Sequence, residues 1–193
     1  MTTKVEDHTP SARERLLAAA DELFYEEGIH TVGIDRVIER AGVAKATLYT
    51  TFGNKEGLIR AYLTERKLAR QERMNAGLAR FHTPRTRLLG VFDVAGETFA
   101  APTFRGCAFV NASAESLPGS AAVELSDETR AWMRELMVQL VREIGAPKPE
   151  TLARQLLLVY DGMMVSARMD RNPKVAAAAR ATAEVLIDAA LAQ

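Results

Sequence analysis

The residues best suited to recognition chemistry lie close together, in residues 45–51. This stretch holds one cation, one phenol and three hydroxyl groups, and no acidic side chain. These groups are Lys45, Thr47, Tyr49, Thr50 and Thr51. They donate hydrogen bonds to phosphate oxygens and to acceptor atoms on base edges, whereas a carboxylate among them would repel a polyanion. The stretch therefore favours contact with a nucleic acid.

Two short predicted helices position these side chains. Apolar residues at i, i+3, i+4 and i+7 predict the first helix, and they are Ile34, Val37, Ile38 and Ala41. Gly42 follows and can take the left-handed conformation that ends a helix. A second helix fits residues 44–51, with Leu48 and Phe52 pointing inward. A helix, a glycine turn and a short helix with a donor-rich outer face are typical of a DNA-binding helix-turn-helix.

The charge distribution agrees with this interpretation. The formal net charge is zero, but residues 36–87 contain twelve Lys and Arg against four acidic residues. Residues 1–35 contain three against eight, and residues 88–193 contain ten against thirteen. A local basic region is what a phosphate backbone requires, although a solvated helix face is the simpler alternative. Its coincidence with Tyr49 and the three threonines favours the electrostatic interpretation.

Composition bounds the class of protein. With 193 residues, 48% hydrophobic and 26% charged, the chain is typical of a soluble globular protein of one or two domains. One cysteine excludes an intrachain disulfide and favours a cytoplasmic location. Residues 1–10 are polar and predict a tail rather than a signal peptide, and no apolar stretch is long enough to span a membrane.

The flanking segments predict further helices. Ser11 and Glu14 form a capping-box pattern at the start of a helix that ends at Gly28. Asn54 is a cap for a long helix over residues 55 to about 81, and its positive end, with Lys55, would face phosphate. The absence of a Gly/Ser-rich linker predicts rigid coupling to the remainder of the chain.

The rest of the chain also predicts helices, over residues 86–100, 105–117, 120–144, 150–169 and 174–192. No segment shows strand alternation bounded by turns. The expected fold is therefore all-α. A three-helix helix-turn-helix DNA-binding domain, residues 1–55, precedes a larger helical effector-binding and dimerisation domain, residues 56–193.

The sequence around the motif resembles the N-terminal domain of the TetR family of bacterial regulators. The resemblance covers residues 12–63 and rests on Gly28, Ile34, Ala41, Gly42, Val43, Leu48, Tyr49, Phe52, Asn54, Lys55 and Glu56. Residues 104–111, Phe-Arg-Gly-Cys-Ala-Phe-Val-Asn, are similar to a stretch in one branch of that family. Gly33, Ala44 and Thr51 depart from it, where the family often has a hydroxyl residue, a serine and a histidine. The resemblance implies a transcriptional regulator that holds a small effector among its C-terminal helices.

The last two helices predict a dimer. Residues 156–160 are apolar on every side of their helix, so both faces need cover. The final helix offers small residues that allow close helix approach, namely Ala177, Ala178, Ala181, Val185 and Ala189. We expect residues 152–168 and 175–191 to meet their two-fold copies in a four-helix bundle, although burial in a monomer core is the alternative. A two-fold protein also matches a palindromic operator.

A set of large soft or aromatic residues after residue 84 predicts an effector pocket. Its members are Phe92, Phe99, Cys107, Phe109, Asn111, Trp132, Met133, Met137, Tyr160, Met163 and Met164, and Glu115 and Asp161 add polar groups in the same segments. Apolar walls with a few polar groups describe a small-molecule site, while plain core packing is the alternative. Cys107 could sense oxidants or electrophiles, but a small buried hydrophobe is the favoured interpretation.

Catalytic and metal chemistry lack support in the sequence. The three histidines, His8, His30 and His82, lie outside the C-terminal helices and leave Cys107 without a base. No Cys/His cluster has metal-ligand spacing, and no cofactor motif occurs. We therefore expect a DNA-binding repressor that a small apolar or aromatic effector releases from its operator. The alternative is a helical carrier or enzyme that keeps the fold without binding an operator.

Overall fold

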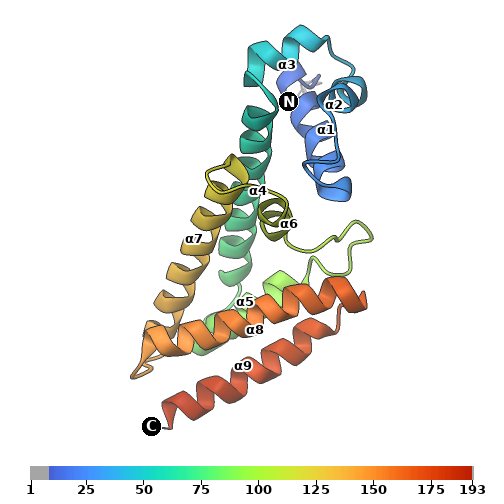
Figure 1. The fold of residues 1–193 in the computed structure, drawn as a ribbon. Helices are drawn as coiled ribbons and strands as arrows, with labels where there is room; N and C mark the ends of the chain where they lie inside the picture. The colour runs from blue at the N-terminus through green and yellow to red at the C-terminus, as the bar shows by residue number, and fades with distance from the viewer. Residues whose placement is uncertain (1–8, 193) are drawn as a thin grey trace, which may run out of the picture.

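The computed structural model describes residues 9–192 and folds them into helices and turns, without a strand. Three short helices form one end of the molecule: α1 (Ala12–Glu27), α2 (Ile34–Ala41) and α3 (Lys45–Phe52). The long helix α4 (Lys55–Leu78) leads away from them (Figure 1). The other end contains α5 (Pro84–Gly96), α6 (Ala108–Ala114), α7 (Ala121–Glu143), α8 (Pro149–Asp170) and α9 (Val175–Leu191). The predicted all-α fold is confirmed.

Local signals set the first three helices. The Ser11 hydroxyl accepts from the Glu14 amide at 3.2 Å, and the Glu14 carboxylate accepts from the Ser11 amide at 2.7 Å, so the predicted capping box is present. Gly42 has φ 62° and ψ 45°, the predicted left-handed turn between α2 and α3. Leu48 is fully buried beneath α3. Most of the polar tail predicted for residues 1–10 lies outside the described residues.

Helix α4 belongs to both hydrophobic clusters of the molecule. Near its start, Leu58 and Leu63 are buried against α1 and α3, and near its end, Met74 and Leu78 are buried with α5 and α7. Asn54 caps it as predicted, because its side-chain oxygen accepts from the Gly57 amide at 2.9 Å. With 24 residues, it is a stiff rod about 36 Å long.

Helix α7 runs beside α4 and is attached to it by charged contacts (Figure 1). The Glu56 carboxylate accepts from the first amide of α7, at Ala121, over 2.5 Å. Two ion pairs follow along the same interface, Arg60–Glu124 and Lys67–Glu128, each with a closest N–O distance of 2.6 Å. The cluster beneath α3 also includes residues of α6 and α7, so those helices share one hydrophobic core with the three-helix end.

Three helices differ from their predicted bounds by three residues or more at one end, and the first is α4, which ends at Leu78 rather than near residue 81. Helix α5 begins at Pro84 rather than residue 86, since Thr83 and Thr86 cap one another and proline suits the first helical turn. It ends at Gly96 rather than residue 100, and residues 97–101 continue in tight turns. Helix α6 is shorter than the predicted 105–117 segment. None of the helices between residues 9 and 192 is long and apolar enough to cross a membrane.

Candidate nucleic-acid interface and adjoining cavities

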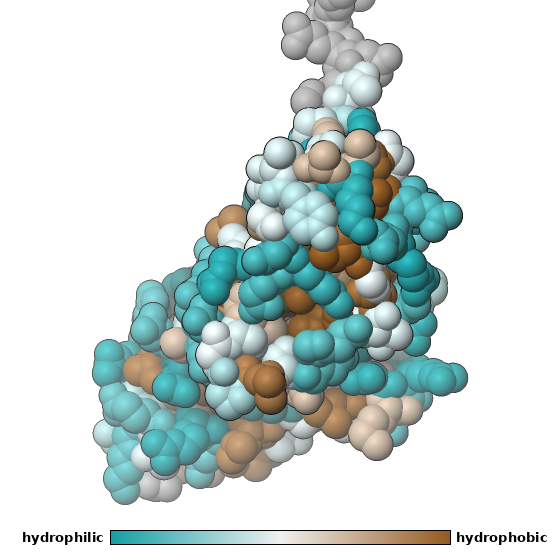
Figure 2. Space-filling model, turned by 45° about the horizontal axis from the view of Figure 1, so that its top comes forward, coloured by the Kyte–Doolittle hydropathy of each residue, from teal (hydrophilic) through white to brown (hydrophobic). Residues whose placement is uncertain are grey.

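The five side chains singled out on the second short helix all lie on α3. Lys45, Tyr49, Thr50 and Thr51 are exposed, and Thr47 is half-buried. Tyr49 is 44% exposed, so a large part of its ring faces solvent. Figure 2 turns this end of the molecule toward the viewer, and its surface is mostly hydrophilic or neutral, with apolar side chains in recesses and small patches.

The hydroxyls of Thr50 and Thr51 already have hydrogen-bond partners within α3. Thr50 Oγ1 donates to the Ala46 carbonyl at 2.9 Å, and Thr51 Oγ1 donates to the Thr47 carbonyl at 2.7 Å. Each hydroxyl therefore presents lone pairs and a neighbouring methyl group to solvent, rather than a free proton. Such a surface complements base amino groups and thymine methyls better than phosphates, which only accept hydrogen bonds.

Lys45 is paired within the chain. Its ammonium lies 2.8 Å from the Asp35 carboxylate of α2, and this carboxylate raises the pKa of Lys45. Both side chains are largely exposed, so solvent screens the pair, it contributes little to stability, and Lys45 can exchange Asp35 for another anion. Lys55 is half-buried, and burial lowers its pKa against the opposing field of Glu115.

The N-termini of α2 and α3 lack side-chain caps. Gly33 and Ala44 occupy the cap positions, and neither provides a side-chain acceptor for the first amides of its helix. Uncapped amides at a helix start carry partial positive charge and suit a phosphate oxygen. From the sequence, Gly33 and Ala44 are recognised only as positions that lack the hydroxyl group common in the family. That their helices therefore begin with uncapped amides was not predicted.

A cavity of about 600 Å³ lies among α4, α6, α7 and α8. Six residues of the predicted effector set contribute to its wall, and they are Cys107, Phe109, Asn111, Met133, Tyr160 and Met164. The other five lie elsewhere. Phe92, Met137 and Met163 are buried in the core of α5, α7 and α8, Trp132 packs against that core, and Phe99 lines a different cleft.

A second cavity, of about 350 Å³, lies on the other side of a shared wall. The two cavities have six lining residues in common, and we name this set the Arg70 wall: Arg70, Gly106, Cys107, Phe109, Tyr160 and Met164. The sequence did not single out Arg70, because it is one of many basic residues along α4. Only the packing of α6 and α8 against that helix distinguishes it from its exposed neighbours.

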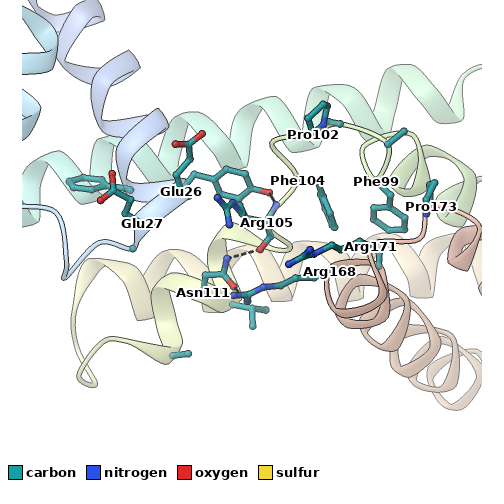
Figure 3. A pocket seen from close by; sticks show the side chains of 18 of the residues that line it. Glu26, Glu27, Phe99, Pro102, Phe104, Arg105, Asn111, Arg168, Arg171 and Pro173 are labelled. Atoms are coloured by element: carbon teal, nitrogen blue, oxygen red, sulfur yellow. Dashed lines mark hydrogen bonds between the residues drawn. The ribbon is translucent and has the colours of Figure 1, made fainter.

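A larger, open cleft of about 1060 Å³ separates the end of α1 from the end of α8 (Figure 3). Arg168 and Arg171 lie on one side of it and Glu26 and Glu27 on the other, and Arg105 lies between them, beside Glu26. Asn111 connects two of the arginines: its amide donates to the Arg105 carbonyl at 3.0 Å, and its oxygen accepts from Arg168 at 2.8 Å.

Tyr25 ties α1 to the segment that enters α6. Its hydroxyl donates to the Gly106 carbonyl and accepts from the Arg105 amide. The guanidinium of Arg66, on α4, stacks 3.8 Å from the centre of the Tyr25 ring, and Arg66 also pairs with Asp21 at 2.6 Å. The three-helix end is therefore connected to the cavity walls through α1 as well as through α4. Within residues 9–192, no group of three or more His, Cys, Asp or Glu side chains is placed to hold a metal ion.

The comparisons with known proteins agree with this architecture. Residues 16–62 match the family model of bacterial regulatory proteins of the tetR family. The chain is 30% identical to the transcriptional regulator AcuR of Cereibacter sphaeroides over 177 residues, which cover 84% of this chain and 78% of AcuR. Among solved structures, SCO4454, a TetR-family transcriptional regulator from Streptomyces coelicolor, superposes with a TM-score of 0.87 at 31% identity and covers 93% of this chain and 95% of that one. A TetR-type regulator from Streptomyces avermitilis gives 0.82 at 31% identity, with 94% and 98% covered.

The chain therefore belongs to the TetR family of bacterial transcriptional regulators. It is a DNA-binding regulator, and its relatives and structural neighbours are regulators rather than enzymes. The resemblance recognised in the sequence and the predicted helix-turn-helix are both confirmed. Regulators of this family bind operators as dimers and respond to small-molecule effectors.

Proposed function

We propose that this regulator is a homodimeric repressor that leaves a palindromic operator when a small apolar or aromatic effector fills the cavity beside α4. The observation that carries the proposal is the position of α4. Its first turns pack beneath α3, and its later turns form part of the cavity wall through Arg70. One stiff helix thus joins the DNA-facing end to the ligand space.

In this proposal α3 enters the major groove. Tyr49 and the threonines Thr47, Thr50 and Thr51 face base edges, while Lys45 and Lys55 contact phosphates. The exposure of Tyr49 and the uncapped amides at the start of α3 support this assignment. Lys45 would exchange Asp35 for a phosphate at little cost, because an exposed ion pair is weak.

The dimer would form through α8 and α9. Apolar residues of both helices are exposed in the monomer, and they are Leu158, Val165, Met169, Val185 and Leu191. Leu158, Gly162, Val165 and Met169 follow one another at helical spacing along a single stripe of α8, and the space beside Gly162 is empty. A partner helix could approach closely there. Exposed apolar stripes of this kind are characteristic of interfaces.

The release mechanism follows from spacing. Two copies of α3 must lie about 34–36 Å apart to enter successive major grooves on one face of DNA. A ligand that favours a conformer with α4 tilted moves both copies of α3 out of register. The ligand can shift the conformational equilibrium only by the difference between its binding free energies for the two conformers. A difference of about 5.5 kcal/mol shifts the ratio of the two conformers from 1:99 to 99:1.

A thermal-shift screen followed by operator titration tests the proposal. Compounds that raise the melting temperature are added, one at a time, to the protein bound to a fluorescent duplex from its own upstream DNA. We expect the operator Kd to rise with the occupancy of the cavity. A carrier or enzyme without operator binding would instead leave that duplex unbound at every protein concentration, and this outcome would contradict the proposal.

A further inference from the structure

We propose that the effector carries a carboxylate that pairs with Arg70, with its apolar part lodged in the 600 Å³ cavity. This inference rests on the proposed function, since it names the chemistry of the ligand at that same site. It begins from a cation that the protein places between two cavities without giving it an anionic partner.

The immediate partners of Arg70 are neutral groups. Arg70 Nη2 donates to the Tyr160 hydroxyl at 2.9 Å, and Nη1 donates to the Cys107 sulfur at 3.5 Å. The rings of Phe109 and Tyr160 lie 6.0 Å and 5.8 Å from the guanidinium carbon. Throughout residues 9–192, no carboxylate lies within ion-pair distance of Arg70, although other arginines of α4, such as Arg60 and Arg66, do have such partners.

Arg70 is half-buried, and a charge partly withdrawn from water is costly unless an opposite charge compensates it. Burial acts to lower the pKa of Arg70, yet its net pKa remains above the ordinary arginine value, so the site stays cationic at neutral pH. A hydroxyl, a thiol and two ring faces supply dipoles and quadrupoles, but no full negative charge. The guanidinium fork matches a carboxylate in shape and can hold it with two parallel hydrogen bonds.

The other charged groups of this cavity do not offset Arg70. Asp161 is paired with Arg130 at 2.7 Å, and Arg168 donates to Asn111. Asp127 is exposed, so its charge is solvated. Deeper in the wall lie the buried rings of Phe109 and Tyr160 and the buried side chain of Met133. The arrangement fits an amphipathic monocarboxylate, with its head on Arg70 and its tail against these apolar groups.

Because Arg70 lies on α4, pairing with a carboxylate can affect the helix that supports the DNA-facing end. A carboxylate drawn to Arg70 acts directly on the helix that supports α3, rather than on a distant wall. Competition for the guanidinium would also weaken its bonds to Tyr160 of α8 and Cys107 at the start of α6. The same contact that binds the ligand can therefore alter how α4 is held between α6 and α8.

Matched pairs of ligands test the inference on the full-length protein without DNA. The probes are phenylacetate, 3-phenylpropanoate and hexanoate, each compared by calorimetry at pH 7.5 with its own primary amide. We expect at least one carboxylate to bind about tenfold or more tightly than its amide, as a charge-assisted pair provides. In Arg70→Met the ratio should fall to about one, and in Arg70→Lys it should stay above one.

Arg134→Gln is the matched control, since it removes an exposed arginine of α7 that lines neither cavity, and its ratio should equal that of the wild type. If no carboxylate binds more tightly than its amide, or if Arg70→Met keeps the preference, the inference is wrong. Operator titrations separate it from the proposed function. If carboxylates bind through Arg70 but do not release DNA, the proposed release mechanism is wrong and the carboxylate inference stands. If amides bind and release DNA as well as carboxylates do, the carboxylate inference is wrong and the release mechanism stands.

Discussion

The Tyr25 hydroxyl of α1 donates to the Gly106 carbonyl at 2.9 Å. Gly106 belongs to the Arg70 wall, so this hydrogen bond joins the three-helix end to the wall of the cavity. The adjacent Arg105 amide donates back to the same hydroxyl at 2.8 Å. A shift of residues 105–107 on ligand binding would therefore act on α1 directly. Helix α1 in turn packs on α2 and α3, so this contact provides a second route beside α4.

Replacing Tyr25 by Phe tests that route. The variant keeps the ring beneath Arg66 but removes both hydrogen bonds, so we expect the free energy of unfolding to fall by about 1–2 kcal/mol. Operator affinity without ligand should change little, while the ligand-induced rise in operator Kd should shrink several-fold. Chemical denaturation and fluorescence anisotropy measure the two effects. If the ligand raises the operator Kd of Tyr25→Phe as much as that of the wild type, the Tyr25 contact does not transmit the effect of the ligand to α1.

Asp35→Asn should strengthen operator binding. The change frees Lys45 and removes a negative charge from the DNA-facing end, so we expect the operator Kd to fall by about two- to fivefold at low salt. Stability should change little, since the pair is exposed and Asp35 adds only a small helix-dipole contribution. The gain should fade as salt is raised. Unchanged or weaker binding of this variant would contradict the prediction that Asp35 competes with a phosphate for Lys45.

Tyr49→Ala and Lys55→Ala should each weaken operator binding without unfolding the protein. Tyr49 is exposed, so its loss leaves no cavity, and we expect a cost of about 1–3 kcal/mol in binding if the ring contacts a base. Loss of Lys55 should reduce the magnitude of the salt slope by about one unit. Lys148→Ala, at the start of α8, is the control and should leave that slope unchanged. Wild-type affinity of both variants at every salt concentration would move the recognition surface elsewhere.

Val185→Arg should separate the dimer. Val185 is 68% exposed in the monomer, so the arginine is tolerated there but would be buried without a partner in a closed interface. Light scattering should report a monomer, and operator affinity should fall with it. Leu68→Arg is the control, because Leu68 is also exposed, at 53%, but lies on α4. A wild-type protein that is monomeric at micromolar concentration would exclude the proposed interface.

Local signals explain how much of the fold could be predicted. The caps at Ser11 and Asn54 and the turn at Gly42 depend on one or two neighbouring residues, so they can be predicted from the sequence. The sequence predicts that this helix begins at residue 86, whereas the reciprocal capping of Thr83 and Thr86 makes Pro84 the first residue of α5. Such errors arise where one residue type both ends and begins a helix.

The cavity could be predicted only in part. A large apolar residue at helical spacing looks the same whether it packs in the core, as Phe92 does, or lines a cavity, as Met133 does. Arg70 was missed for a similar reason, because its isolation from carboxylates depends on tertiary packing. On α3, by contrast, residue types and spacing sufficed to place all five side chains on one short helix, and their contacts with DNA remain a prediction.

The most direct test of the central claim is the operator Kd measured with and without a saturating cavity ligand at one fixed salt concentration, together with the ligand Kd measured with and without operator. The ligand is the compound that raises the melting temperature most. We predict that the ligand raises the operator Kd at least tenfold, and that operator DNA raises the ligand Kd by the same factor, since coupling between two sites is reciprocal. An operator Kd that stays unchanged while the cavity is saturated would contradict the proposed release.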